Sequence, residues 1–307
     1  MIESVDAVAY SSDRFFADLK STADDMATPF DEAGVRKALD VFEDEMNRSV
    51  VQLKTTTKPG DGLYYRFFYK WENDLLDIAR RNGFVGREDG PVGRLQREAL
   101  DAFSGSTQAG LDFEVGRGLA KVWTFTGVRP VEELFDLPSL PASVRAHAEF
   151  FARHGLRRVF FVASDFQSET MNVYPIIEED CRTEEWLREL VRETGGSFAG
   201  APDAAHMMSS LARTACLGMT FSWKHAELHR WALYSLNVPD GGRTEILPEL
   251  PQHLDDFYQK APTLNAVPQT NVAWSFGRAG FYTKLEKSYA KDANHFLTTE
   301  MGCDLRR

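Results

Sequence analysis

The sequence predicts an α+β fold in which a ten-stranded antiparallel β-barrel encloses a ligand cavity and is surrounded by helices. Three observations predict it. Segments with strand patterning come in pairs joined by short turns, helical segments precede each pair, and this unit recurs five times at intervals of roughly 50 residues. A hairpin makes each strand pair antiparallel, and closure into a barrel leaves no exposed sheet edge. A barrel of ten strands is wide enough to hold a ligand.

The first unit shows how the elements are identified. The spacing of Phe15 and Leu19 predicts a helix at 11–25, and that of Val35 and Leu39 predicts one at 31–46. Strands follow at 49–56 and 63–69, separated by a Pro- and Gly-containing turn at 58–62. The later units comprise helices at 70–82 and 91–104 before strands at 110–115 and 119–126, helices at 130–135 and 141–154 before strands at 157–164 and 169–176, helices at 183–194 and 203–211 before strands at 214–222 and 228–236, and one helix at 250–260 before strands at 269–277 and 281–290.

Composition limits the classes of function. The 307 residues are 43% hydrophobic, and no linker divides them, so we expect one domain over 1–307. A formal net charge of −11 argues against nucleic acid and anionic membranes as partners. Three unpaired cysteines fit a reducing compartment, and neither a signal peptide nor a membrane-spanning stretch is visible. We therefore expect a soluble, cytoplasmic and monomeric protein.

A Lys or Arg lies inside each of several strands that are otherwise apolar and aromatic. Alternation along a strand places Tyr64, Arg66 and Phe68 on one face. A buried cation is costly unless it is paired, so several that converge on one interior indicate a polyanion such as diphosphate. The other interpretation is that each cation ends a solvated strand and pairs with a surface carboxylate. The cations are Lys54, Arg66, Lys121, Arg230 and Lys284.

Glu286 shares the strand face of Lys284 and is predicted to point into the same interior. It is either a simple ion-pair partner or a base or hydrogen-bond acceptor that positions an aromatic nucleophile. Aromatic side chains on the predicted inner faces are either ordinary core or a wall that stabilises a cation. The aromatic residues are Tyr64, Phe68, Trp123, Phe125, Phe160 and Tyr234, and Cys216 is predicted to be a small apolar neighbour on an inner face.

Several other sequence motifs do not indicate a functional site. His225 and His229 are four residues apart, but they lie at a turn and a strand start, where this spacing does not focus both rings on one metal. The acidic clusters at 24–25, 178–180 and 255–256 do not complete an Asp-rich magnesium motif. No dinucleotide-binding, P-loop or nucleophile-elbow pattern occurs.

Several stretches together resemble the bacterial aromatic prenyltransferases with the ααββ "PT-barrel" fold, over almost the whole chain. The resemblance is to the subgroup that contains the clorobiocin-pathway 4-hydroxyphenylpyruvate prenyltransferase and the phenazine prenyltransferases. The stretches are KTT at 54–56, PGD at 59–61, YRFF at 65–68, GRGLAK at 116–121, LPASV at 140–144, NVY at 172–174, WSFGR at 274–278 and EKSY at 286–289.

The resemblance implies dimethylallyl diphosphate or a longer isoprenoid diphosphate as the prenyl donor and a small aromatic as the acceptor. It implies that Glu286 binds the acceptor, as the catalytic acid or base, and that Tyr64, Phe68, Trp123, Phe160 and Cys216 line the acceptor and prenyl pocket. It also implies a diphosphate site formed by Lys54, Arg66, Lys121, Asn172, Tyr174, Arg230, Tyr234 and Lys284.

Two departures from the family pattern refine the expectation. Magnesium-dependent relatives carry Asp where this chain has Tyr64, so we expect no metal and no other cofactor. Relatives that use a keto acid carry Arg where this chain has Phe160. Alternation is expected to place Phe160 in the cavity, on the face of Val162 and Ser164, and Phe161 on the opposite, helix-covered face. This favours a polycyclic acceptor such as a dihydrophenazine carboxylic acid over 4-hydroxyphenylpyruvate.

Three alternatives remain open at this point. The acceptor could be 4-hydroxyphenylpyruvate or another phenol. The barrel could be a non-catalytic carrier of an anionic aromatic ligand, which would need its cations only for a carboxylate. The chain could also be an isoprenoid cyclase, which needs no acceptor.

Overall fold

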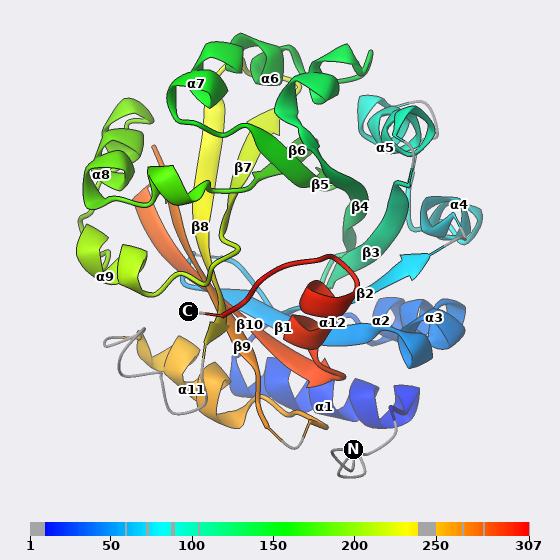
Figure 1. The fold of residues 1–307 in the computed structure, drawn as a ribbon. Coiled ribbons are helices and arrows are strands. Elements are labelled where there is room, and N and C mark those ends of the chain that lie inside the picture. Colours follow the sequence, from blue (N-terminus) through cyan, green and yellow to red (C-terminus); the bar gives the residue numbers. More distant parts are fainter. Residues whose placement is uncertain are drawn as a thin grey trace.

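The structure is a computed structural model that describes residues 10–58, 60–71, 74–86, 90–103, 105–238, 250–265, 267–278 and 280–306. Ten antiparallel strands close into one barrel in the order β1-β10-β9-β8-β7-β6-β5-β4-β3-β2 (Figure 1), as the sequence predicted. The strands are β1 (Val50–Thr56), β2 (Tyr64–Trp71), β3 (Thr107–Glu114), β4 (Gly118–Pro130), β5 (Arg158–Asp165), β6 (Thr170–Pro175), β7 (Cys216–Ser222), β8 (Leu228–Val238), β9 (Thr270–Gly277) and β10 (Gly280–Ala290).

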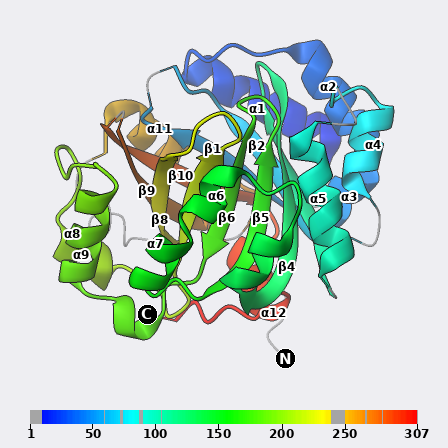
Figure 2. The ribbon, with the colours of Figure 1, turned by 90° about the horizontal axis from the view of Figure 1, so that it is seen from above.

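Helices surround the barrel, and one further helix lies at an end of it (Figures 1 and 2). Among the described residues, no helix is long and apolar enough to cross a membrane. The α-helices are α1 (Ser12–Asp25), α2 (Glu32–Val41), α3 (Glu43–Arg48), α4 (Leu75–Arg81), α5 (Pro91–Ala102), α6 (Ala142–Ala146), α7 (Ala148–Arg153), α8 (Glu184–Glu193), α9 (Ala204–Ser209), α11 (Gln252–Lys260) and α12 (Ala293–Thr299), and two 3-10 helices cover Val131–Asp136 and Glu179–Cys181.

Alternation along the strands produces two separate apolar layers. In β2, Tyr65 and Phe67 point outward and pack with the helices in the larger buried cluster, whereas Arg66 and Phe68 point inward. In β4, Val122 points outward while Trp123 belongs to a smaller cluster inside the barrel. The outer layer attaches the helices, which leaves the inner faces of the strands available for a site.

Four details of the secondary structure differ from the sequence prediction. The helix expected at 31–46 is interrupted at Phe42, whose ring packs against Phe67 and Phe113, and that expected at 141–154 is interrupted at His147. In the helix expected at 70–82, residues 70 and 71 instead end β2, and α4 begins only after the N-cap Asp74. Residues 72, 73 and 104 of the predicted helices, and residue 59 of the predicted turn, lie outside the described residues.

The fourth difference is α12, which the sequence did not predict. The side chain of Asp292 caps it by accepting a hydrogen bond from His295 N at 2.8 Å. Ala293 and Phe296 of this helix belong to the apolar cluster inside the barrel, together with Met301, Cys303 and Leu305 of the segment that follows. In Figure 1, α12 and this segment lie across one end of the barrel, which they help to close.

Candidate active site

The barrel interior contains two adjoining chambers of different character. The polar chamber, with a volume of about 170 Å³, lies at the end where the β1–β2, β3–β4 and β5–β6 turns converge. The apolar chamber, with a volume of about 70 Å³, lies toward α12. Tyr234 lines both. The polar chamber is lined chiefly by Lys54, Asp61, Tyr64, Lys121, Asp165, Asn172, Arg230, Tyr234, Ser275 and Lys284, and the apolar chamber by Gln52, Arg66, Phe68, Trp123, Phe160, Phe161, Tyr174, Cys216, Glu286 and Phe296.

Two of the cations that the sequence predicted for this chamber have no carboxylate partner among the described residues. Lys284 Nζ donates a hydrogen bond of 2.7 Å to the hydroxyl of Tyr234 and makes no ion pair within the described part of the chain. Arg230 makes neither a hydrogen bond nor an ion pair with any described residue. Ser275 Oγ, which is buried on the same lining, also has no hydrogen-bond partner in the described part of the chain. These groups are therefore available to an anionic ligand.

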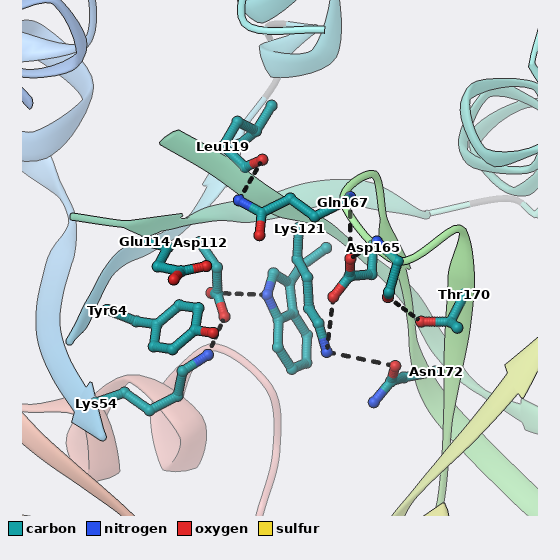
Figure 3. A network of polar contacts seen from close by, with 12 residues as sticks. Lys54, Tyr64, Asp112, Glu114, Leu119, Lys121, Asp165, Gln167, Thr170 and Asn172 are labelled. Carbon is teal, nitrogen blue, oxygen red and sulfur yellow. Dashed lines mark hydrogen bonds and ion pairs between the residues drawn. The ribbon is translucent and has the colours of Figure 1, made fainter. Parts of the chain in front are cut away.

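Lys54 and Lys121, two further lysines of this chamber, are held by neighbouring strands (Figure 3). Lys121 Nζ lies 3.4 Å from Asn172 Oδ1 and 3.9 Å from Asp165 Oδ2. Lys54 Nζ donates a hydrogen bond of 2.9 Å to Asp112 Oδ2. Their side chains are fixed in position before any ligand arrives, which reduces the entropy that binding must remove.

Burial tunes the charges of this chamber. It lowers the pKa of Lys284 to about 7, with Lys54, Arg66 and Arg230 adding repulsion and Glu286 opposing the shift. Burial likewise lowers the pKa of Lys121 to about 8, against the attraction of Asp165. A bound anion would reverse both shifts by stabilising the ammonium forms.

Tyr64 belongs to the polar chamber and not to the aromatic pocket for which the sequence assigned it. Its hydroxyl donates a hydrogen bond of 2.6 Å to Asp61 Oδ1, and Thr56 donates one of 2.6 Å to Asp61 Oδ2. Burial alone would raise the pKa of Asp61, but these hydrogen bonds lower it overall. Among the described residues, no cluster of three or more His, Cys, Asp or Glu side chains could hold a metal ion.

The apolar chamber is walled by aromatic rings. Trp123 lies 4.8 Å from Tyr174 and 5.5 Å from Phe68, measured between ring centroids. Cys216 is buried in the same cluster, and burial raises the pKa of its thiol. Negative ring faces attract a cation, so this wall is suited to an electron-poor carbon centre or a flat ring.

Phe160 lines this chamber as expected, but the reasoning behind that expectation was wrong. A β-bulge between Val159 and Phe161 interrupts the alternation, so both Phe160 and Phe161 face inward, with ring centroids 4.8 Å apart. Val162 lies in the outer cluster, and Ser164 Oγ bonds to Gln96 of α5 at 2.7 Å. Phe161 is therefore an additional wall residue that the sequence analysis placed on the wrong face.

Arg66 also differs from its expected place. It lies in the apolar chamber and not among the residues that line the polar one. Arg66 Nη2 donates a hydrogen bond of 2.6 Å to Glu286 Oε1, and its Nε lies 3.5 Å from Asp112 Oδ1. Arg66, Glu286 and Asp112 are all buried, so the carboxylate predicted to bind the acceptor is oriented by a guanidinium from β2.

Sequence reasoning missed several groups that the strand pattern could have suggested. Asp112 and Glu114 alternate in the segment LDFEVG, and the β3–β4 register places Asp112 opposite Lys121. Asp165 follows the predicted end of its strand by one residue. Gln52 lies two residues before Lys54 on the same face, and its buried Nε2, on the wall of the apolar chamber, has no hydrogen-bond partner among the residues described.

A comparison with known protein families identifies the chain. The family model described as "Aromatic prenyltransferase Orf2" matches residues 10–300. The chain belongs to the aromatic prenyltransferase Orf2 family. A 4-hydroxyphenylpyruvate 3-dimethylallyltransferase from Streptomyces niveus is 30% identical, with 94% of this chain and 88% of the relative covered. An aromatic prenyltransferase from Sclerotinia sclerotiorum is 28% identical, with 91% of each chain covered.

Solved structures agree with this family assignment at the level of the fold. The crystal structure of 6-dimethylallyltryptophan synthase from Micromonospora olivasterospora, in complex with DMASPP and Trp, matches this Orf2-family chain with a TM-score of 0.58. The match covers 91% of this chain and 97% of that one at 14% identity. AnaPT from Neosartorya fischeri matches with a TM-score of 0.54 at 13% identity, covering 94% and 96% of the two chains.

Proposed function

We propose that this member of the aromatic prenyltransferase family transfers a dimethylallyl group from dimethylallyl diphosphate to a ring carbon of a small aromatic acceptor. The observation that carries the proposal is the polar chamber beside a chamber walled by aromatic rings: among the described residues, Lys284 and Arg230 have no carboxylate partner and Ser275 Oγ has no hydrogen-bond partner. Further support comes from the relative that is named as a dimethylallyltransferase.

In the proposed reaction the allylic C–O bond breaks, and diphosphate leaves with the electron pair. Lys54, Lys121, Arg230 and Lys284 stabilise the charge that develops on the diphosphate, and Asn172 and Tyr234 complete its site. Tyr174 was also predicted to bind the diphosphate, but it lines the apolar chamber and reaches the polar one only through the hydrogen bond of 3.3 Å that Asn172 Nδ2 donates to its hydroxyl. The allylic cation forms against Trp123 and its aromatic neighbours, which exclude water.

The acceptor ring then attacks this cation, which forms the new C–C bond. Glu286 accepts a hydrogen bond from a hydroxyl or N–H of the acceptor and holds the ring in reach of the cation. The ring proton is lost to Glu286 or to the departing diphosphate, which restores aromaticity. Arg66 is proposed to orient Glu286 and not to bind the diphosphate, because its guanidinium donates to that carboxylate.

For the acceptor we propose a fused tricyclic aromatic, with a dihydrophenazine carboxylic acid as the first candidate. Phe160 and Phe161 support this by presenting a continuous apolar wall, on which a flat ring system can stack. The second candidate is 4-hydroxyphenylpyruvate, because a relative named for that acceptor is 30% identical to this chain.

The decisive experiment incubates the purified protein with dimethylallyl diphosphate and each acceptor, and measures diphosphate release and product mass. We expect release to require an aromatic acceptor and the product to gain one dimethylallyl group. Binding of the aromatic without any diphosphate release would contradict the proposal and favour a carrier protein. Release with a product derived from the donor alone would favour a cyclase.

We further propose that the reaction needs no metal ion and that the chain acts as a single-domain cytoplasmic monomer. The cations of the polar chamber support metal independence, since they supply the positive charge that magnesium would otherwise bring. Turnover should be the same with and without excess EDTA. Loss of activity in EDTA that magnesium restores would contradict this expectation.

A further inference from the structure

Asp112 lies between the two chambers and lines neither of them. It is fully buried on β3, where the strand register places it between Arg66 of β2 and Lys121 of β4. Its carboxylate nevertheless contacts three donors. Oδ2 accepts a hydrogen bond of 2.9 Å from Lys54 Nζ, and Oδ1 accepts one of 2.9 Å from Trp123 Nε1. Arg66 Nε lies 3.5 Å from Oδ1.

The three partners of Asp112 belong to different parts of the site. Lys54 faces the polar chamber, Trp123 forms part of the aromatic wall, and Arg66 holds Glu286 at 2.6 Å. A change at one partner must therefore alter the charge and hydrogen bonding that Asp112 offers to the other two. Lys121, by contrast, faces the polar chamber but is held by Asp165 and Asn172 (Figure 3).

The electrostatics keep Asp112 ionised. Burial by itself would raise its pKa, but Arg66, Lys54 and, less strongly, Lys121 outweigh burial and lower it to about 2. A carboxylate that accepts the indole N–H of Trp123 also pushes electron density into the ring, which strengthens the attraction between the ring face and a nearby cation. The same charge therefore bears on binding of the diphosphate, on the cation wall and on Glu286.

We propose that Asp112 is a positioning residue that couples the two chambers. It fixes Lys54 for the donor, and through Arg66 and Trp123 it fixes Glu286 and the aromatic wall for the acceptor. The inference rests on the proposed prenyl transfer and names a further residue for it. It predicts that a change on the donor side, transmitted through Asp112, alters how the enzyme uses the acceptor.

A double-mutant cycle tests this coupling with Lys54→Met, Asp112→Asn and their combination. The Michaelis constants are measured separately for dimethylallyl diphosphate and for 5,10-dihydrophenazine-1-carboxylate, which is kept reduced under nitrogen. Asp112→Asn should raise both constants about tenfold, the effect of about one charge-assisted hydrogen bond. Lys54→Met should also raise the acceptor constant, by about threefold to fivefold, and should add nothing to it in the Asp112→Asn background.

Lys121→Met is the matched control, because it removes another lysine of the polar chamber that is not bonded to Asp112. It should weaken donor use and change the acceptor constant far less than Lys54→Met does, because Lys121 acts on the charge of Asp112 from across the β3–β4 ladder without a hydrogen bond to it. Equal effects of Lys54→Met and Lys121→Met on the acceptor constant would overturn the proposal, as would strictly additive effects in the cycle.

A measurement independent of turnover separates this inference from the proposed function. The indole Nε1–H resonance of Trp123, assigned with Trp123→Phe, is followed in ¹⁵N-labelled protein. It should shift most in Lys54→Met and in Asp112→Asn, less in Lys121→Met, and not in Glu114→Gln, which alters a buried carboxylate two residues away. If the protein turned over no acceptor but the resonance shifted as described, the proposed acceptor would be wrong and the positioning role supported. An unchanged resonance in Lys54→Met would overturn the positioning role, even if Asp112→Asn failed to fold.

Discussion

The two chambers of the barrel use buried charge in opposite ways. In the polar chamber, Lys284 and Arg230 have no carboxylate partner within the described residues, so their charge is directed at a ligand. In the apolar chamber, Arg66 and Glu286 neutralise one another at 2.6 Å. Buried cations without a carboxylate partner lower the stability of the protein but can bind an anionic ligand. Breaking the pair of Arg66 and Glu286 instead leaves an uncompensated buried charge. Residues of the same chemical type should therefore respond differently to substitution.

The largest effect should come from removing the unpaired cations of the polar chamber together. Each charge-assisted contact to the diphosphate contributes roughly 1.5–3 kcal/mol, so Lys284→Met with Arg230→Met should lower kcat/KM for dimethylallyl diphosphate by about 10²–10⁴-fold. Thermal melting should show little or no loss of stability, because neither side chain makes an ion pair with any residue that the structure describes. If the double variant melted at a lower temperature than the parent but used the donor normally, these cations would be structural. The two chambers would then not differ in how they use buried charge.

Arg66→Met provides the opposite test, on stability. It leaves Glu286 and Asp112 buried without their guanidinium partner, so the free energy of unfolding should fall by about 3–5 kcal/mol. Urea denaturation of this variant and of Lys284→Met gives the comparison. If Arg66→Met were as stable as the parent, Arg66 would not hold a buried pair, and a direct role with the diphosphate would regain support.

How far the sequence could predict this arrangement depends on the range of the interaction. Alternation within a strand correctly assigned the inward faces of Arg66, Trp123 and Glu286, because the side-chain period in a strand is local. The bond between Arg66 and Glu286 spans 220 residues and depends on which strands become neighbours when the barrel closes. The same limit concealed Asp112, whose partners lie on three other strands.

Two further features depended on local irregularity and on packing. The bulge before Phe161 adds one residue to β5 and turns Phe160 inward, which a strict two-residue period cannot predict. The seven-residue helix α12 has a weak local signal, and its position follows from burying Phe296 against the apolar chamber. Both features shape the apolar chamber, which explains why its lining was harder to predict than the positive charge of the polar one.

A smaller effect should appear in the pH dependence of donor use. Burial lowers the pKa of Lys284 to about 7 in the free protein, so this ammonium loses its proton as the pH rises above about 7. Because the diphosphate binds the protonated form, kcat/KM for the donor should fall as the pH rises from 7 to 9, by at most about tenfold per pH unit for this group. Lys284→Met should not show the decrease in donor kcat/KM that begins near pH 7. The Michaelis constant for the acceptor, measured at the same pH values, serves as an internal comparison. A flat profile up to pH 9 in the parent would show that Lys284 does not titrate in this range.

The smallest effect should arise from the wall of the apolar chamber. Phe160 stacks in a continuous apolar surface with Phe161, and such aromatic contacts add roughly 0.5–1.5 kcal/mol beyond area burial. The parent should therefore prefer a dihydrophenazine carboxylic acid over 4-hydroxyphenylpyruvate, and Phe160→Arg should narrow that preference by about threefold to tenfold. The guanidinium would offer the keto-acid carboxylate a partner that the wall now lacks.

Product masses from a competition between both acceptors measure the preference. The Michaelis constant for the donor should not change, because Phe160 does not line the polar chamber. Preferential prenylation of 4-hydroxyphenylpyruvate by the parent would show that the apolar wall does not select the acceptor.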